Sequence, residues 1–309
     1  MPDPNLRTSI SPPQIASGIS AIISGSSPVN KVYARVDVLD PLELALNYQR
    51  IAFIGALLGV TFILLEPKLA GSRDGSFAVN GQKLHIEILG TFAPTVVFEA
   101  GVGNDSTTWK FVAGPIATAA RVVLYDRAGL GQSLPLIKNT AVTADEVATN
   151  LHGLLAAADI RPPYILVGHS LGGLYVQMFA RKYPKEVSGA VLLDSSSADA
   201  PSELKTRARL DPGTAAYLEQ EGIPESNKQV MNGGPFPDIA LTVIAATDHG
   251  PFFKQWEATL MRLQQQLATL SPQATFIVAQ GSGHDVQMDR PEIVIDAVRR
   301  MVREAGPNP

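Results

Sequence analysis

The segment best equipped for chemistry is GHSLG at residues 168–172, a G-x-S-x-G sequence with Ser170 at its centre. It directly follows a short apolar run, residues 164–167, and opens a segment with helical spacing of apolar residues. The pentapeptide indicates a serine nucleophile only where it lies in a turn between a strand and a helix, as it does here. Because the turn is tight, we expect a strained backbone at Ser170, and residues larger than the two glycines would collide with neighbouring backbone. The hydroxyl of Ser170 is therefore predicted to stand above a sheet edge as a nucleophile.

A serine hydroxyl is a poor nucleophile unless a base removes its proton, so the histidines come next. The chain has five of them. His284 lies in the Gly-rich segment GSGH, between the last predicted strand and the last predicted helix, where the loop can face Ser170. His249 follows the end of another predicted strand and is the alternative. We expect His284 to be the base.

A carboxylate is needed to orient the imidazole and to stabilise its charged form. Asp194 ends the apolar run 187–193, and Asp248 follows the run 241–246. Either one preserves the chain order serine, acid, histidine. Spacing alone does not choose between them.

These side chains need a scaffold, and the alternation of apolar patterns predicts one. The runs 77–79 and 83–89 flank Asn80-Gly81, a strong hairpin signal. Further buried strands are predicted at residues 95–100, 121–125, 164–167, 187–193, 241–246 and 274–279. Helical spacing is found at residues 144–158, 171–183, 253–270 and 291–304. The fold class is therefore α/β, with a mostly parallel, twisted sheet covered by helices on both faces.

Composition limits the classes of function. The 309 residues include 17% charged side chains and carry a net charge of −4, which excludes an intrinsically disordered chain and argues against a nucleic-acid partner. Cysteine is absent, so disulfides, thiolate nucleophiles and cysteine-ligated metals are excluded. No His, Asp or Glu cluster has metal-ligand spacing, and we expect neither a metal nor a cofactor.

The most apolar run, residues 51–65, holds fifteen uncharged residues between Arg50 and Glu66. This is shorter than the roughly 20 residues that cross a bilayer. Extended to residues 48–69, the segment reaches that length with charged side chains near its ends, where they can snorkel. We expect a leader, residues 1–74, whose apolar helix associates with a membrane. The alternative is a cytoplasmic protein with this helix packed on the downstream domain.

Residues 195–238 are too long for an ordinary connection between strands, and they contain helix-like pieces and Gly/Pro breaks. We expect a small cap over the site. Five apolar side chains either line an acyl pocket or belong to the core: Met231, Phe236, Phe252, Phe253 and Trp256. Residues 126–133, DRAGLGQS, lack the G-x-x-x-x-G-K-S/T pattern of a phosphate loop and are predicted to be structural.

Residues 75–309 resemble the α/β-hydrolase superfamily. The resemblance rests on five segments in order: PTVVFEAGVGNDSTTW, RVVLYDRAGLGQS, PYILVGHSLGG, VSGAVLLDSSS and GSGHDVQMDRP. It implies an α/β-hydrolase fold of about eight strands, with residues 75–309 as one catalytic domain. The subgroup that it most resembles contains serine esterase-like hydrolases with an N-terminal apolar segment. A strand ending in Leu-Val-Asp is typical there, which favours Asp194 over Asp248.

Acyl transfer also needs hydrogen-bond donors for the oxyanion. One is expected to be the backbone N–H of Leu171, directly after the nucleophile. The resemblance places the other in the loop after residues 95–100. The superfamily usually has His-Gly there, whereas this chain has Ala100-Gly101, and Val102 becomes the second donor.

The expected function is cofactor-free hydrolysis of small, apolar carboxylic esters through an acyl-enzyme. Ser170, His284 and Asp194 form the catalytic set, and Val102 and Leu171 form the oxyanion hole. The same parts serve an amidase, a lactonase or a thioesterase, because a fold does not fix a function. A ligand-binding sensor with a slow residual triad is the alternative from another class.

Overall fold

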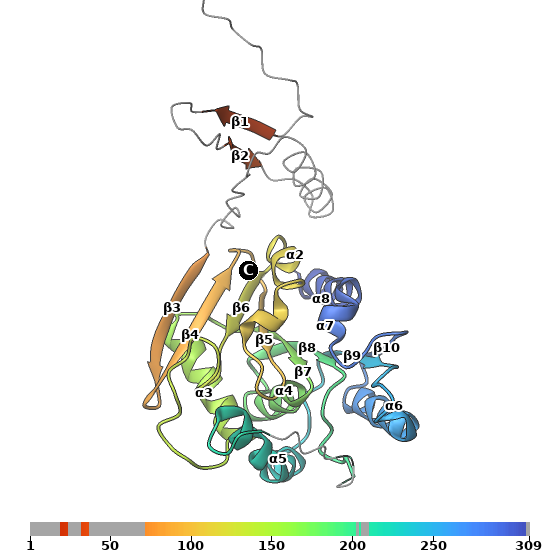
Figure 1. The fold of residues 1–309 in the computed structure, drawn as a ribbon. Coiled ribbons are helices and arrows are strands. Elements are labelled where there is room, and N and C mark those ends of the chain that lie inside the picture. Colours follow the sequence, from red (N-terminus) through yellow and green to blue (C-terminus); the bar gives the residue numbers. More distant parts are fainter. Residues whose placement is uncertain (1–18, 24–31, 37–71, 202–203, 205–209, 307–309) are drawn as a thin grey trace, which may run out of the picture. The chain divides into compact units, whose positions relative to one another are not determined.

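The computed structural model describes residues 19–23, 32–36, 72–201, 204 and 210–306 (Figure 1). The chain divides into two compact units, Met1–Lys68 and Leu69–Pro309. In the first, β1 (Ile19–Ile23) and β2 (Val32–Val36) pair antiparallel. The predicted membrane-associated segment 48–69 lies outside the described residues and stays a prediction. Among the helices that are described, none combines the length and the apolar character needed to cross a membrane.

The second unit is built on an eight-stranded sheet with the order β10-β9-β8-β7-β5-β6-β4-β3. The strands are β3 (Arg73–Val79), β4 (Gln82–Leu89), β5 (Thr95–Glu99), β6 (Arg121–Tyr125), β7 (Tyr164–His169), β8 (Val187–Leu193), β9 (Ala240–Ala246) and β10 (Ala274–Ala279). β3 and β4 form an antiparallel hairpin, and β5 to β10 run parallel. The predicted sheet is confirmed.

The turn of the hairpin follows from its sequence. Asn80 and Gly81 have φ values of 48° and 81°, in the left-handed region that a two-residue hairpin turn requires and that these residue types tolerate. The predicted hairpin is confirmed at this position.

The parallel strands read as unbroken apolar runs because both of their faces are covered. Every residue of β5 and of β7 is buried. Successive residues point to opposite faces, so Leu166 belongs to one apolar cluster while Ile165 and Val167 belong to the other. The core is therefore two layers, one on each face of the sheet.

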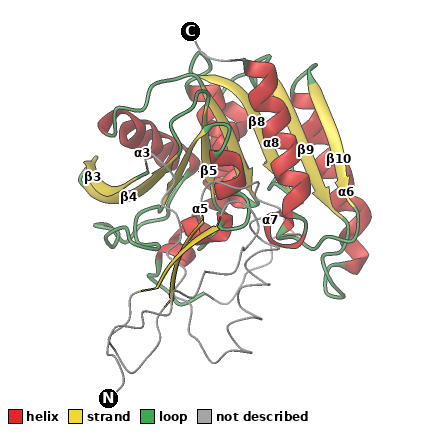
Figure 2. Cartoon of the chain, turned by 90° about the horizontal axis from the view of Figure 1, so that it is seen from above, coloured by secondary structure: helices red, strands yellow, loops and turns green. Residues whose placement is uncertain are grey.

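Helices complete both layers (Figure 2). One face carries α3 (Ala144–Ala157), α4 (Leu171–Lys182) and α6 (Glu257–Leu267), and the other carries α2 (Ala113–Ala117) and α8 (Pro291–Ala305). The short helix α7 (Val286–Asp289) precedes α8. The helix predicted from the apolar spacing over residues 171–183 is confirmed, and its first ten residues, Leu171 to Ala180, are all buried.

The long segment between β8 and β9 contains α5 (Ala215–Asn232). The expected Gly/Pro breaks, Pro212-Gly213 and Gly233-Gly234-Pro235, lie on either side of α5, which continues through Pro224 as one helix of 18 residues. It packs on α3 and α4. Gly222 allows the close approach to the α3 side, because a Cβ there would lie 1.7 Å from the carbonyl oxygen of Val142.

Because the central strands are parallel, their carboxyl ends meet at one edge of the sheet. Four of the loops that leave this edge carry the residues singled out above: Ser170 after β7, Asp194 after β8, His249 after β9 and His284 after β10. The loop after β5 carries Val102. The fold therefore gathers residues that lie up to 182 positions apart, from 102 to 284, at one edge.

Candidate active site

Ser170 sits at a sharp turn between β7 and α4. Its backbone has φ 52° and ψ −122°, a strained conformation for a residue with a side chain. A Cβ on Gly168 would lie 2.7 Å from the carbonyl oxygen of Gly172, and one on Gly172 would lie 2.2 Å from that of Glu99. Both predictions about this turn, the strain and the need for glycines, are confirmed. Ser170 itself is only partly buried, so a substrate can reach it.

Asp194 and His284 meet at the same edge. His284 Nδ1 lies 2.6 Å from Asp194 Oδ2, and the other carboxylate oxygen, Oδ1, accepts a hydrogen bond from the backbone N–H of Ala246 at 3.2 Å. The side chain of Asp194 is 4% exposed, whereas that of His284 is 47% exposed. The structure therefore pairs an accessible imidazole with a buried, fixed carboxylate.

Asp248, the other candidate acid, lies elsewhere. It is exposed, and its Oδ1 accepts a hydrogen bond from the backbone N–H of Gly250 at 3.1 Å. Its backbone N–H donates to the carbonyl of Ser282. The hydrogen bonds of Asp248 thus stabilise the loop in which it lies. The carboxylate that contacts His284 is that of Asp194.

His249 contacts the same carboxylate from another side. Its Nε2 lies 2.7 Å from Asp194 Oδ2, and its Nδ1 lies 2.9 Å from Glu257 Oε2, at the start of α6. The backbone N–H of His249 also donates to Glu257 Oε1 at 2.8 Å. The sequence offered His249 as an alternative base, but both ring nitrogens are occupied by carboxylates. Glu257 was not singled out from the sequence at all.

These contacts control protonation. Burial disfavours the charge of Asp194, but hydrogen bonds from His249 and His284 outweigh burial and hold the pKa of Asp194 well below its usual range. Burial likewise disfavours the charged form of His249, and its bonds to Asp194 and Glu257 overcome that effect and raise the pKa of His249 to about 9. Asp194 is therefore an anion and His249 a cation at neutral pH.

His169, the variable position of the pentapeptide, holds the His284 loop. Its Nε2 lies 3.0 Å from the carbonyl oxygen of His284, and the two rings are 4.7 Å apart. Burial first, and then the nearby charge of His284, lowers the pKa of His169 to about 4. His169 is therefore neutral, and its Nε2–H donates to that carbonyl.

The loop after β5 lies directly against Ser170. A Cβ on Gly101 would be 3.4 Å from the Cβ of Ser170. Val102 follows in this loop, and Leu171 is the first residue of α4, so its N–H has no helical carbonyl to bind. The two expected oxyanion donors are thus in the segments that flank the nucleophile.

Arg127 fixes the conformation of that loop. Its guanidinium donates to the carbonyl oxygens of Ala100 at 2.8 Å and Gly101 at 2.6 Å. It also pairs with Glu99 at 2.7 Å and with Glu219 of α5 at 2.6 Å. Burial opposes the guanidinium charge, but the two carboxylates outweigh it and raise the pKa of Arg127 above its ordinary value.

Glu219 closes the arrangement from α5. One of its oxygens accepts a hydrogen bond from the backbone N–H of Gly103 at 2.8 Å, and Ala216, one turn earlier, lies against Gly103. The first turns of α5 therefore contact the loop that carries Val102. The sequence predicted a structural role for residues 126–133. It did not indicate that Arg127, within that segment, would hold the loop after β5.

The five apolar candidates for an acyl pocket are divided by the structure. Phe236 is buried and belongs to the core layer that contains α4. Met231 and Phe252 are 62% and 75% exposed, and Phe252 stacks edge-on against Phe253. Phe253 and Trp256 are partly buried. Phe236 is thus a core residue, and the pair Phe252–Phe253 lies three to four residues after His249 on the active-site edge.

Asp194, His249 and His284 are also the residues that could hold a metal ion, since one ligand atom of each lies within 4.8 Å of the others. The spacing along the sequence does not reveal these three residues as a group, because each lies in the loop after a different strand. Both imidazoles approach one oxygen at 2.6–2.7 Å, which is hydrogen-bond distance. The arrangement is that of a carboxylate shared by two donors.

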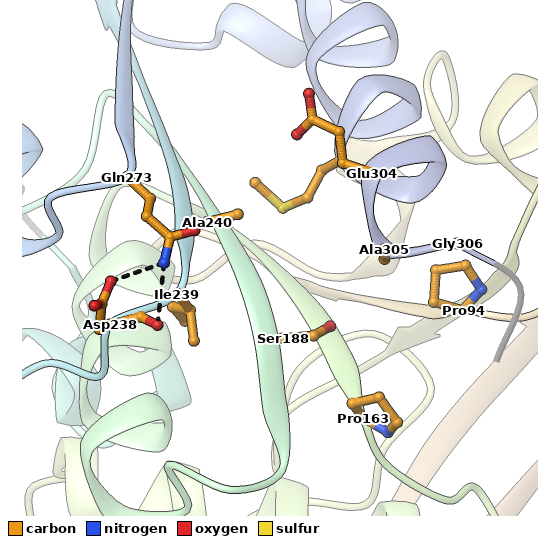
Figure 3. A pocket seen from close by; sticks show the side chains of 11 residues that line it. Pro94, Pro163, Ser188, Asp238, Ile239, Ala240, Gln273, Glu304, Ala305 and Gly306 are labelled. Atoms are coloured by element: carbon orange, nitrogen blue, oxygen red, sulfur yellow. Dashed lines mark hydrogen bonds between the residues drawn. The ribbon is translucent and has the colours of Figure 1, made fainter. Parts of the chain in front are cut away.

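A pocket of about 340 Å³ opens at the opposite, amino edge of the sheet (Figure 3). Its lining includes Pro94 and Pro163, just before β5 and β7, together with Asp238 and Gln273, which are hydrogen-bonded to each other at 2.8 Å. Ser170, His284 and Asp194 all lie at the other edge, so this pocket is separate from the candidate active site.

Comparison with known proteins agrees with this geometry. The model of the alpha/beta hydrolase fold family matches residues 94–229. An uncharacterized Bacillus subtilis protein, YqjL, is 31% identical over 72% of this chain and 88% of its own length. A putative carbamate hydrolase, RutD of Yersinia enterocolitica, is 31% identical over 45% of this chain and 52% of its own.

Among solved structures, an esterase from Thermogutta terrifontis superposes with a TM-score of 0.56 at 21% identity, covering 75% of this chain and 98% of the esterase. This likeness supports the fold. The match to the family model and the 31% identity to YqjL over most of both chains show the family. The chain belongs to the α/β-hydrolase fold family.

Proposed function

We propose that this protein is a serine hydrolase that cleaves carboxylic esters through an acyl-enzyme. The observation that carries the proposal is the contact of His284 Nδ1 with Asp194 Oδ2 at 2.6 Å, at the sheet edge where Ser170 stands on a strained turn. A base held by an acid, at the same sheet edge as a partly accessible serine, is the arrangement that activates a hydroxyl nucleophile.

In the first half-reaction Ser170 Oγ attacks the carbonyl carbon of the ester, and His284 Nε2 accepts the serine proton. The negative charge that develops on the carbonyl oxygen is stabilised by the backbone N–H groups of Val102 and Leu171. The positive end of α4 lies at the same position. As the tetrahedral intermediate collapses, His284 returns the proton to the leaving alcohol, and the acyl group remains on Ser170.

In the second half-reaction a water molecule replaces the alcohol. His284 takes one of its protons as the water oxygen attacks the acyl carbon, and the same oxyanion donors act again. Collapse of this intermediate releases the carboxylic acid and returns the proton from His284 to Ser170. Asp194 remains ionised throughout, because its role is to hold and stabilise the imidazolium.

The same residues could cleave an amide, a thioester, a lactone or a carbamate, the last named in the description of RutD. The pair Phe252–Phe253, of which Phe252 is 75% exposed, follows His249 in the same loop and supports an apolar acyl or alcohol group. A ligand-binding sensor with a residual triad would have the same geometry but would hydrolyse esters much more slowly.

The test is turnover of short p-nitrophenyl esters by the full chain and by Ser170→Ala. We expect Ser170→Ala to lose turnover by a factor of about 10⁴ or more while its unfolding transition stays that of the wild type. Ser188→Ala, at the pocket on the opposite edge, is the matched control and should retain activity.

Wild-type-like turnover in Ser170→Ala would refute the mechanism. Wild-type turnover far below the enzyme range of roughly 1 to 10³ s⁻¹ on every ester of a panel, with tight binding of one of them, would favour the sensor.

A further inference from the structure

The loop after β5, which carries Val102, is a closed turn. The N–H of Asn104 donates to the carbonyl oxygen of Gly101 at 3.1 Å, and Gly103 has a φ of 69°, which a glycine adopts without strain. Within the part of the chain that the structure describes, the N–H of Val102 has no acceptor. The turn therefore leaves this backbone donor free, and its direction depends on the two peptide planes that flank Val102.

Arg127 fixes the first of these planes. The carbonyl of Gly101 and the N–H of Val102 belong to one peptide group, which is trans and therefore holds them in opposite directions. The guanidinium of Arg127 donates to that carbonyl oxygen at 2.6 Å and to the carbonyl oxygen of Ala100 at 2.8 Å. Because the Gly101 carbonyl is held toward Arg127, the N–H of Val102 is turned away from the guanidinium.

Glu219 fixes the second plane. Its Oε2 accepts a hydrogen bond from the N–H of Gly103 at 2.8 Å, and the same carboxylate accepts from Nε and Nη2 of Arg127 at 2.6 and 3.1 Å. The side chains of Glu219 and Arg127 are 2% and 6% exposed, so water scarcely competes for these bonds. Val102 therefore lies between two peptide groups that one ion pair holds.

The carboxylate of Glu219 comes from α5, whose first turn is packed on two loops of the active-site edge. A Cβ on Gly103 would lie 2.8 Å from that of Ala216, and a Cβ on Gly129, in the loop after β6, would lie 2.9 Å from that of Ala215. The helix thus touches the same two loops that Glu219 joins by hydrogen bonds. A shift of α5 would therefore change the hydrogen bond to Gly103.

The directions of these hydrogen bonds matter more than their contribution to stability. A buried ion pair adds little net stability compared with apolar side chains of equal volume, because both charges lose their hydration. Apolar side chains, however, make no directional contact with a carbonyl or an N–H. Stability alone therefore does not account for the three hydrogen bonds that the pair makes to the backbone of residues 100–103.

We propose that Arg127 and Glu219 are positioning residues for ester hydrolysis: their ion pair orients the N–H of Val102 as an oxyanion donor and couples α5 to the oxyanion hole. This inference rests on the proposed function. Both side chains act through the backbone of the turn and not on the reacting atoms. A displacement of α5 would then alter the stabilisation of the transition state and leave the binding of the ester unchanged.

The first test measures kcat and KM of the full chain for p-nitrophenyl esters in the wild type, Glu219→Ala and Glu219→Gln. Removal of a whole oxyanion donor lowers kcat by about 10² to 10³. We expect Glu219→Ala, in which the donor is present but no longer held, to lower kcat by about 10-fold to 100-fold. KM should stay within about twofold, because the oxyanion forms only in the transition state. Glu219→Gln keeps an acceptor oxygen for Gly103 and should recover most of the lost kcat.

Ser226→Ala is the matched control. Ser226 lies further along α5 and is buried, and its Oγ accepts a hydrogen bond from the backbone N–H of Ala144, at the start of α3, at 2.9 Å. The change removes a buried acceptor from the same helix without touching the loop after β5, so kcat should stay that of the wild type. A wild-type kcat in Glu219→Ala, or an equal fall of kcat in Ser226→Ala, would overturn the proposal.

Arg127→Lys carries the same test if Glu219→Ala does not fold. Lysine keeps the positive charge but lacks the planar fork that reaches two carbonyls and a carboxylate together. We expect kcat to fall by about 10-fold or more with KM unchanged. A wild-type kcat in Arg127→Lys contradicts the proposal.

A measurement without turnover separates this inference from the proposed function. Amide hydrogen exchange, followed by NMR in Ser170→Ala, reports whether the N–H of Gly103 is held. We expect this amide to exchange faster by a factor of about 10 or more when Glu219→Ala is added, and to be unaffected when Ser226→Ala is added. An unchanged exchange rate in the Glu219→Ala protein overturns the inference, whereas absence of fluorophosphonate labelling at Ser170 in the wild type overturns the proposed function.

Discussion

Two clusters lie at the sheet edge of Ser170, and each places a cation between two carboxylates. On one side Arg127 lies between Glu99 and Glu219, at 2.7 and 2.6 Å. On the other side His249 lies between Asp194 and Glu257, at 2.7 and 2.9 Å. The distances are alike, but the cations differ. A guanidinium keeps its proton up to pH 9 and above, whereas an imidazolium can lose its proton below that pH.

The difference matches what each cluster touches. Arg127 has five N–H donors and uses two of its nitrogens on the carbonyls of Ala100 and Gly101, so it fixes the backbone next to Ser170. His249 has two ring donors, and both meet carboxylates. The Arg127 cluster therefore fixes the backbone of the loop after β5, while the His249 cluster holds the carboxylate of Asp194.

The largest effect on activity should come from the acid of the His249 cluster. We expect Asp194→Asn to lower kcat/KM for a p-nitrophenyl ester by about 10⁴, because an amide cannot stabilise the imidazolium of His284. Asp248→Asn is the matched control and should stay within about twofold of the wild type, as that side chain is exposed. Equal and small effects of the two changes would contradict the assignment of Asp194.

The largest effect on stability should come from the other cluster. Arg127→Met leaves two buried carboxylates without their cation, and we expect the free energy of unfolding to fall by about 3–5 kcal/mol in urea titrations. Arg161→Met, which removes an arginine that is 85% exposed and lies 3.6 Å from Asp159, should change it by less than about 0.5 kcal/mol. If Arg127→Met were equally mild, the Arg127 cluster would not hold the loop.

A smaller effect, on the pH dependence of stability, distinguishes His249 from Arg127. The pKa of His249 is about 9 in the folded chain and about 6.5 in an unfolded one. Its ion pairs therefore contribute stability that is complete below pH 6.5 and is lost as the pH rises through 9, about 2 kcal/mol after allowance for solvent. Over the same range the Arg127 cluster keeps its charge.

The measurement is the free energy of unfolding at pH 6, 7.5 and 9 for the wild type and His249→Gln. The difference between the two proteins should shrink toward pH 9. A difference that is constant with pH would show that His249 does not hold its proton.

The comparison also marks where sequence reasoning stops. Ser170 and its glycines follow from a local turn, and the strands follow from apolar runs buried on both faces, so both were predictable. Asp194 and Asp248 each end a strand at the same edge, and no local property tells which carboxylate turns toward His284. The contacts of His249 with Glu257, and of Arg127 with Glu219, join residues from separate elements. Only the packed fold decides such contacts.

The account depends most on Ser170 as the residue that becomes acylated. Its most direct test is peptide mass spectrometry of the wild-type chain after reaction with a fluorophosphonate. The account predicts one phosphonyl group per chain on the peptide that contains Ser170, and none after the reaction of Ser170→Ala. An adduct on another residue, or ester turnover by a chain that takes up no label, would contradict it.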